Sequence, residues 1–392
     1  MCFQYIKVNQ LFSEKRIKTI SPTIKLQNED IKVSGKTAVV SQEQELVSGY
    51  ADLVDDKLTN CPFTVFGDHT EIIKYIDFPF IQGADGIKII KADDVSIDSK
   101  YLYYSLKNCY YPTGFYQRHF KLFKKTYIPN LDITHQRKIA TVLYNYDNLI
   151  EYNNKRIKAL ENIVEELYKE WFVRFRFPGY EKTKFENRIP LNWKYEKFSS
   201  IYSCYRGISY SSDEIECEEG MNLINLKNIS AYGGFRRDGL KRYDGKYKTE
   251  HCVKYNDLVM GVTDMTQDRR TVGYVALIPK ISGVISADLV KIISEIDNIF
   301  SYCLFRFGFY SKLFSQFGNG ANVIHLKPSS IKNQKILIPN RELIDKFVYI
   351  AKPIFDEIEI LNIKNEQLIK QRDSLLPRLM SGKLSVEGKE II

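Results

Sequence analysis

The stretch from Ile128 to Pro178, IPNLDITHQRKIATVLYNYDNLIEYNNKRIKALENIVEELYKEWFVRFRFP, decides how the rest of the chain is organised. After its opening Ile-Pro-Asn it has no proline or glycine before its last residue, so it predicts a helix of roughly ten turns. Apolar residues recur at seven-residue spacing, which is typical of a coiled-coil seam. The seam of this first helix is formed by Leu143, Ile150, Ile157, Leu160 and Val164.

A second copy of the same pattern follows 210 residues later in the sequence. Ile338-Pro339-Asn340 repeats Ile128-Pro129-Asn130, and a second seven-residue seam follows it, formed by Ile354, Leu361, Leu368 and Leu375. Each long helix is preceded by short β-rich runs that are separated by turn signals. The chain is therefore predicted to be duplicated internally. Antiparallel pairing of the two helices is the simplest assembly, because a parallel pair would need a return path along the whole helix.

We therefore expect an α+β fold, in which two mixed α/β domains are separated by an antiparallel two-helix coiled coil with a pseudo-twofold internal repeat. The expected segments are a first domain at 1–131, a central helix at 132–178, a second domain at 179–337, a C-terminal helix at 338–384 and a tail at 385–392. Asn153 and Asn154 lie at or beside the first seam, and Asn365 lies in the second. They either form a register-fixing polar pair or lie at the edge of the seam in water.

Composition sets broader bounds on the class of protein. The 392 residues, with 44% hydrophobic and 27% charged side chains, are those of a folded soluble protein of two or three domains. A net charge of +9 fits a polyanion partner, although proteins with other roles share it. The seven cysteines contain no C-x-x-C pair, so we expect reduced thiols. The chain shows no signal-peptide pattern and no membrane-length apolar run, so we expect a cytoplasmic protein without membrane contact.

Several motifs then follow one another in a distinctive order. The central helix begins with Ile128-Pro129 and Gln136–Ala140 and continues through Asp147-x-x-Ile150, and the second domain begins with Ile189-Pro190-x-x-Trp193. The other motifs are Val40-Ser41-Gln42, Gly49-Tyr50, Phe66–Thr70, Gly83-x-Asp85-Gly86 and Gln371–Gly382. In this joint order the chain resembles, over almost its whole length, the specificity subunit of type I restriction–modification systems. The first domain departs from the family because it lacks the Ile-Pro-x-x-Trp start.

The resemblance implies a specific division of labour. The two domains would be target-recognition domains that each read one half of a split double-stranded DNA sequence, and the helix pair would set the gap. The second domain has Met260–Asp264 where the first has Gly67–Thr70, so the two are expected to read different sequences. The chain itself would be non-catalytic and bind no cofactor. Two methyltransferase subunits and the restriction subunits, a translocase and endonuclease, would dock on it and carry S-adenosylmethionine, ATP and magnesium.

The residues expected to contact DNA are cations and side chains that can bond base edges. In the second domain, a glycine- and tyrosine-rich loop carries Arg236, Arg237, Lys241 and Arg242, and a solvated basic loop is the alternative interpretation. A second loop carries Thr263, Gln267, Arg269 and Arg270, whose arginines could instead pair with Asp264 and Asp268. Weaker candidates there are Arg206, Tyr210, Asn319 and Asn322. In the first domain the candidates are Ser41, Gln42, His69, Thr70, Arg118, Lys121 and Lys124.

Two other functions remain open from the sequence. One is a self-contained enzyme that modifies or cleaves DNA, but the chain lacks an adenine-methylation motif, a Walker A loop and a metal-binding cluster. His69 beside Asp68 is not accompanied by a nucleophile or a metal-ligand set, so a loop role is the better interpretation. The other is a coiled-coil scaffold that binds protein only. The duplicated domains and the basic loops argue against that scaffold.

Overall fold

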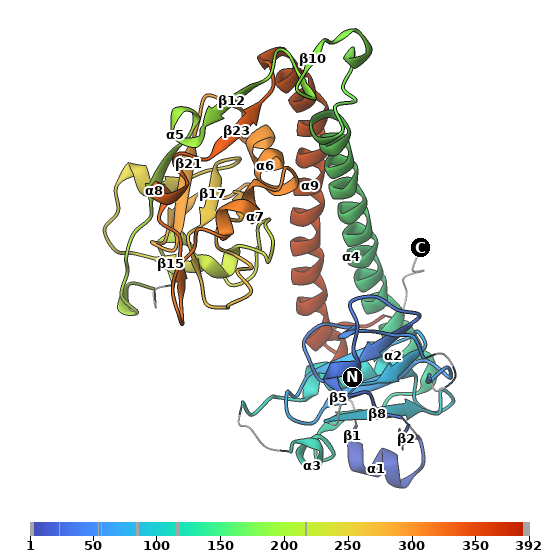
Figure 1. Ribbon diagram of the computed structural model, residues 1–392. Coiled ribbons are helices and arrows are strands. Elements are labelled where there is room, and N and C mark those ends of the chain that lie inside the picture. The colour runs from blue at the N-terminus through green and yellow to red at the C-terminus, as the bar shows by residue number, and fades with distance from the viewer. Residues whose placement is uncertain are drawn as a thin grey trace. The chain divides into compact units, whose positions relative to one another are not determined.

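The structure is a computed structural model that describes residues 4–22, 24–53, 55, 57–83, 86–114, 118–215 and 218–386, and Figure 1 shows its elements. Asp85 of the family motif, Cys2, Cys217 and the tail from residue 387 lie outside these residues. The chain divides into two compact units. Unit 1 comprises Met1–Asn153 with Lys364–Ile392, and unit 2 comprises Asn154–Ile363.

Unit 1 is built on two small sheets. The first has the order β2 (Ile17–Ile20), β8 (Ile87–Ala92), β5 (Phe63–Gly67) and β6 (Ile73–Ile76), and its described pairings are antiparallel. The second has the order β4 (Gly49–Ala51), β3 (Thr37–Val40) and β7 (Phe80–Gln82), in which β3 and β7 run parallel. Strands β1 (Tyr5–Lys7) and β9 (Tyr127–Pro129) form a separate antiparallel pair.

Alternation along the strands explains how unit 1 packs. Ile87 and Ile89 of β8 join the core that β3, β5 and β7 form, whereas Ile90 and Ala92 face the helices. The helices of this unit are α1 (Val8–Ser13), η1 (Asn28–Asp30), α2 (Ser99–Cys109) and α3 (Phe120–Phe123). The side chain of Asp98 caps α2 by accepting a hydrogen bond from the Tyr101 backbone N–H at 2.9 Å. The first sheet therefore has apolar cores on both faces.

Unit 2 has corresponding sheets. One has the order β13 (Ser203–Arg206), β21 (Leu289–Ile293), β17 (Leu258–Gly261) and β19 (Val275–Leu277). The other has the order β15 (Lys241–Tyr243), β14 (Met221–Ile224), β20 (Gly283–Ile285) and β16 (Cys252–Val253), with β14 and β20 parallel. The two-stranded pairs are β12 (Lys194–Lys197) with β23 (Lys335–Ile338), β10 (Phe185–Glu186) with β11 (Ile189–Pro190), and β18 (Thr263–Asp264) with β22 (Ile324–His325).

Unit 2 contains the short helices η3 (Tyr180–Lys182), η4 (Asp213–Ile215), η5 (Leu226–Asn228) and η6 (Thr249–His251). Four other helices, α5 (Phe198–Ile201), α6 (Asn298–Phe307), α7 (Tyr310–Ser315) and α8 (Pro328–Ile331), pack on the sheet of β13, β21, β17 and β19. Phe300, Phe305 and Phe314 are fully buried between these helices and the sheet. The aromatic-rich segment that follows β21 therefore forms the core of this unit.

Two long helices contribute to both units. They are α4 (Ile133–Tyr168), which one π-helical turn extends as η2 (Lys169–Val173), and α9 (Arg341–Met380). In unit 1, Asp147 bonds Arg372 at 2.5 Å and Asn153 bonds Asn365 at 2.8 Å. The α4 residue number rises while the α9 number falls, so the helices are antiparallel. In unit 2, Arg156 lies 2.9 Å from Glu357, and the Trp171 ring packs on Phe347.

The two helices are shorter than the sequence pattern predicts. Helicity was expected to continue to Pro178, but it ends at Val173, and Phe175 has a backbone φ of +57° that no helix allows. Trp171, Phe172 and Phe177 are each only 7% exposed, because they pack around Trp193 in the core of unit 2. The C-terminal helix begins at Arg341 rather than at 338, because Ile338 belongs to β23 and the Asn340 side chain caps the Leu343 N–H.

The seam residues differ in how deeply they are buried. Leu143, Val164 and Leu361 are buried, whereas Ile150, Ile157, Leu160, Ile354, Leu368 and Leu375 are half-buried. The Asn153–Asn365 hydrogen bond places both amides in the seam, and Asn365 is 7% exposed. Of the two interpretations that the sequence leaves open, the structure therefore supports the polar pair.

Candidate nucleic-acid interface

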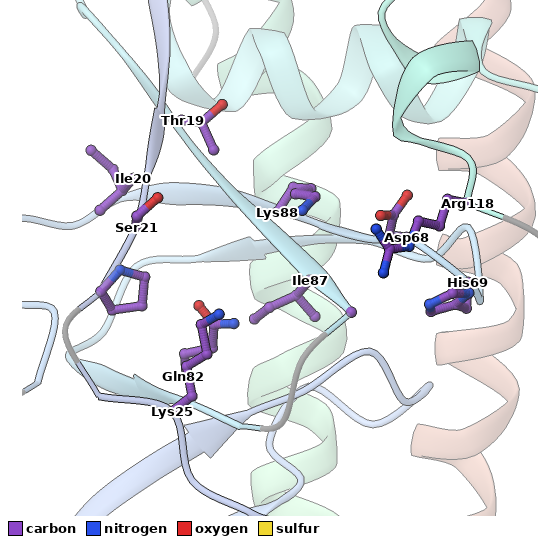
Figure 2. A pocket seen from close by; sticks show the side chains of 12 residues that line it. Thr19, Ile20, Ser21, Lys25, Asp68, His69, Gln82, Ile87, Lys88 and Arg118 are labelled. Carbon is purple, nitrogen blue, oxygen red and sulfur yellow. The ribbon is translucent and has the colours of Figure 1, made fainter.

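Unit 1 contains a polar pocket of about 430 Å³ beside the end of β2 and the start of β8. Figure 2 shows Asp68, His69 and Arg118 on one side, Thr19, Ile20 and Ser21 on the other, and Lys88 between them. The remaining lining residues are Pro22, Lys25, Gln82, Gly86 and Ile87. The segments come from β2, the loop after β5, the end of β7, β8 and the approach to α3, so only the fold brings them together.

The charges around the pocket are mainly positive. Lys25, Lys88 and Arg118 line it, and among the described lining residues Asp68 is the one carboxylate. Arg118 is exposed, and Lys88 is half-buried with its Nζ atom 5.8 Å from the centre of the Phe120 ring. Such a set of cations attracts an anion such as a phosphate group.

Asp68 is held firmly at one end of the pocket. Its backbone N–H donates to the Gly86 carbonyl at 2.6 Å, and its own carbonyl accepts from the His119 N–H at 2.9 Å. Its Oδ1 atom accepts from the Phe120 N–H at 2.8 Å. Asp68 is 5% exposed. The carboxylate is therefore recessed and held in place in the wall of the pocket.

A buried acid–base pair supports the loop that carries Asp68. Glu71 and His119 are both buried, and the Glu71 Oε1 atom lies 2.9 Å from His119 Nδ1. Burial acts to raise the pKa of Glu71, but hydrogen bonds from Thr113, Tyr110 and Gly114 and the nearby His119 together lower it. His119 is fully buried, and its backbone N–H supports the loop by donating to the Asp68 carbonyl.

Three of the residues predicted to contact DNA in unit 1 bond the loops to one another. Ser41 is 6% exposed, and its carbonyl accepts from Lys74 Nζ at 2.9 Å. The Thr70 hydroxyl donates to the Gln42 carbonyl at 2.6 Å. A side chain at Gly86, where φ is +115°, would collide with the Gln42 amide. Ser41 is buried and Gln42 is half-buried, and their carbonyls hold neighbouring segments in place, whereas direct contact with DNA at these residues stays a prediction.

The other predicted residues of unit 1 lie at or near the surface. His69 and Arg118 line the pocket. Lys121 is exposed on α3, whereas Lys124 is half-buried, with its Nζ atom 4.8 Å from the centre of the Phe120 ring. Exposed cations beside the pocket extend its positive potential.

In unit 2, only some cations of the glycine- and tyrosine-rich loop are exposed for contact with DNA. Arg236, Lys241 and Arg242 are exposed, and Arg236 pairs with Asp238 at 2.7 Å. Arg237 instead donates to Glu359 of α9 at 2.9 Å, and the Glu359 side chain is 8% exposed. Arg237 therefore fixes the loop to the helix, and a DNA contact at this residue stays a prediction.

The second loop of unit 2 is organised by Asp264. This side chain is 2% exposed and accepts hydrogen bonds from Thr266 and Thr271 at 2.6–2.8 Å, so it does not pair with an arginine. Thr263 is also buried, which argues against direct contact with DNA. Arg270 pairs with Asp268, as one of the two interpretations expected.

The remaining candidates of unit 2 are divided between internal and exposed roles. Gln267 donates to the Ala321 carbonyl at 2.5 Å, and Arg269 donates to the Ser315 and Gln316 carbonyls at 3.2 Å. Arg206 is exposed, although its Nε donates to the Ala287 carbonyl at 2.9 Å. Tyr210 is half-buried, and Asn319 and Asn322 are exposed.

Sequence reasoning missed Lys25, Gln82 and Lys88 as pocket residues. Lys88 could have been found, because it lies between Ile87 and Ile89 on a predicted strand and must point away from their core. Lys25 and Gln82 lie outside any regular polar pattern, and only the β3–β7 pairing and the Lys25–Gln82 bridge bring them to the pocket.

Two further findings apply to the residues that the structure describes. No helix within them is both long enough and apolar enough to cross a membrane. Those same ranges contain no group of three or more His, Cys, Asp and Glu residues that could hold a metal ion.

Comparison with known proteins gives a consistent result, although no family model matches the chain. The type I restriction enzyme MjaIX specificity subunit of Methanocaldococcus jannaschii is 29% identical over 279 residues, which are 67% of this chain and 62% of the relative. The MjaVIII specificity subunit of the same organism is 24% identical over 321 residues, covering 74% and 72%. The chain thus spans less than two thirds of the length of the first relative.

The fold comparison covers more of the chain. The S subunit of the type I restriction–modification system from M. genitalium aligns with 96% of this chain and 96% of its own, with a TM-score of 0.58 and 13% identity. At that identity the likeness concerns the fold alone. The chain is therefore a homologue of type I restriction enzyme specificity subunits, and it has the fold of a type I S subunit.

Proposed function

We propose that this chain is the sequence-specific DNA-recognition subunit of a type I restriction–modification complex. Each unit would read one half of a split double-stranded target. The chain would be non-catalytic and would act in the cytoplasm.

One observation carries this proposal, namely that both units pair their strands in the same way. The order β2-β8-β5-β6 in unit 1 corresponds to β13-β21-β17-β19 in unit 2, and the parallel pair β3–β7 corresponds to β14–β20. The sheets of each unit are followed in sequence by a long helix, α4 after those of unit 1 and α9 after those of unit 2. Two similar readers on one chain suit a target of two half-sites, because reader separation then sets the spacing of the half-sites.

Surface charge supports DNA as the ligand. Unit 1 exposes Arg118 and Lys121, and unit 2 exposes Arg236, Lys241 and Arg242. Cations of this kind neutralise phosphates and release counterions, so binding should weaken steeply with salt. Their loops differ in sequence and in anchoring, which suits two different half-sites.

The long helices offer surface for the partner subunits. In unit 1, Leu149 and Tyr152 of α4 are 51% and 66% exposed. In unit 2, Tyr349 and Ile360 of α9 are 83% and 40% exposed and are eleven residues apart, which places them on one helix face. Such surface suits the docking of two methyltransferase subunits and of restriction subunits. S-adenosylmethionine, ATP and magnesium would belong to those subunits.

Methylome sequencing tests the proposal directly. Cells with the complete system should methylate a split sequence, and deletion of the gene for this chain should abolish that methylation. A continuous methylated motif, or an unchanged one after deletion, would contradict the proposal. Cleavage or methylation of DNA by the purified chain alone would favour the self-contained enzyme instead.

A domain exchange separates the two readers. Replacing residues 190–337 with the corresponding segment of another specificity subunit should change one half of the methylated motif and leave the other unchanged. The matched control is exchange of the first domain, which should change only the opposite half. A simultaneous change of both halves would show that the units do not read independently.

A further inference from the structure

We propose that the polar pocket of unit 1 binds a single nucleotide that is not stacked in a duplex. This inference rests on the proposed function and deepens it. The ligand is defined by its chemistry, an anionic phosphate joined to a flat base with N–H groups. It could come from a nucleotide turned out of the target DNA or from a free mononucleotide.

The first argument is the shape of the site. A reading group in an intact duplex must protrude, because base edges lie at the bottom of a groove between two ridges of phosphate. Asp68 does the opposite, since it is 5% exposed and lies in the wall of a hollow. The recessed Asp68 carboxylate therefore cannot touch a base edge that is itself recessed in a groove. Only a group that projects from its ligand can reach this carboxylate, and an unstacked nucleotide projects in that way.

The second argument is the size of the site. Its volume of about 430 Å³ lies within the range of about 300–1,000 Å³ that is common for sites of small molecules. A duplex about 20 Å wide is too large to enter, whereas one nucleotide fits. The pocket is also built from the rigid strands β2 and β8, so its dimensions do not depend on one loop.

The third argument is that the pocket combines three kinds of chemical group. Lys25, Lys88 and Arg118 supply positive charge for the phosphate. Ile20 and Ile87 supply apolar surface for the faces of a base. The Asp68 carboxylate is an acceptor for base N–H groups, and it would repel a phosphate if it stood alone. Neither a bare phosphate site nor a purely apolar groove needs all three groups together.

The position of Asp68 gives the site a preference among bases. Its Oδ1 already accepts from the Phe120 N–H, so the carboxylate cannot rotate away from the pocket. A fixed acceptor favours bases with exocyclic amino groups, namely cytosine, adenine and guanine, over thymine. Asp68→Asn keeps an oxygen for Phe120 and replaces the other oxygen by an amide donor, so it should reduce this preference without unfolding the loop.

Calorimetric titration of the full chain with dAMP, dCMP, dGMP and dTMP tests the proposal. At least one amino-bearing nucleotide should bind more tightly than dTMP. K88A and R118A should each weaken that binding about tenfold, consistent with loss of a charged contact worth about 1.4 kcal/mol. The matched control is K18A, which removes an exposed lysine of β2 that is not among the residues lining the pocket. Absence of binding for all four nucleotides, or equal binding by K88A, R118A and K18A, would overturn the proposal.

A second arm identifies the source of the nucleotide. Target duplexes that carry 2-aminopurine at successive positions become fluorescent where a base leaves the stack. Brightening with the wild-type chain but not with R118A would assign the pocket to a nucleotide of the target. Mononucleotide binding without brightening would assign it to a free nucleotide. An intact methylated split motif in cells that carry K88A or R118A would exclude the target DNA as the source of the nucleotide and leave the proposed function standing.

Discussion

Asn153 of α4 donates a hydrogen bond from Nδ2 to the Oδ1 atom of Asn365 of α9 at 2.8 Å. The pair lies in an otherwise apolar seam, and Asn365 is 7% exposed. A buried amide pair is less stabilising than apolar packing, but any shift of one helix along the other separates the two amides. We infer that this pair specifies the register of the helices at the expense of some stability.

Substitutions at this pair should reveal both effects. N365L should lower the free energy of unfolding by about 1 kcal/mol, because it leaves the Asn153 amide unpaired. The double variant N153L/N365L should recover that loss or exceed it. Urea unfolding measures both, and N145L on the exposed side of α4 is the matched control. A double variant that is less stable than N365L would contradict the account.

The Arg237–Glu359 pair should contribute to the stability of unit 2 rather than to the positive charge that attracts DNA. Glu359 also accepts from the Lys280 backbone N–H at 2.7 Å, so both carboxylate oxygens are used. E359A should destabilise unit 2 by about 3 kcal/mol, because it removes the carboxylate that accepts from both the half-buried Arg237 and the Lys280 backbone N–H. Thermal unfolding measures the effect.

Arg236 provides the comparison within the same loop. R236A removes an exposed cation that pairs with exposed Asp238, so it should change stability by less than about 0.5 kcal/mol. It should nevertheless weaken DNA binding and reduce its salt dependence. Equal loss of stability in R236A and R237A would show that the two arginines are not divided in this way.

The lowered pKa of Asp264 predicts that the stability of the folded protein depends on pH. Burial acts to raise its pKa, but the hydrogen bonds from Thr271 and Thr266 together lower it below the ordinary value of 3.8. A lowered folded-state pKa stabilises the protein above the unfolded-state pKa, and this stabilisation is lost as pH falls through the folded-state pKa. D264N should therefore be less stable than wild type near neutrality, and the difference should shrink below about pH 4. The pH dependence of thermal unfolding measures this.

Asp268→Asn is the control for that experiment. Asp268 lies in the same loop but is exposed and pairs only with exposed Arg270. Its substitution should change stability little at any of these pH values. A constant difference between wild type and D264N from neutral to acid pH would show that the Asp264 charge is not what stabilises the loop.

The sequence predicted the helix pair well, because a seven-residue repeat is a local signal that burial preserves. It also indicated short β-rich runs ahead of each long helix, and strands such as Thr37–Val40 and Leu258–Gly261 lie in those segments. It did not predict the helix end near Phe175, because no proline or glycine precedes Pro178 and only packing around Trp193 explains the break. The sequence also did not reveal which cations are exposed to solvent. Arg236 and Arg237 are adjacent in sequence, yet a partner 122 residues away decides that Arg237 is internal.

The proposed function predicts that the helices control the gap in the target. One heptad inserted after Asn153 and one after Ile363 lies at the boundaries of the two units and preserves the contacts within each. Seven residues add about 10.5 Å, which is at most about three base pairs. Methylome sequencing should show a longer gap between unchanged half-sites. Changed half-sites with the original gap would contradict a spacing role.

Tyr349 gives the final prediction, which concerns the partner subunits. It is 83% exposed on α9 although it is a large apolar side chain, and Ile360 lies on the same face. If a methyltransferase subunit covers this face, Y349D should reduce its co-purification at least tenfold, because a carboxylate would be buried without a partner. Stability of the isolated chain should not change. K352E, also exposed on α9, is the matched charge-changing control. Undiminished assembly of Y349D would place the docking surface elsewhere on the chain.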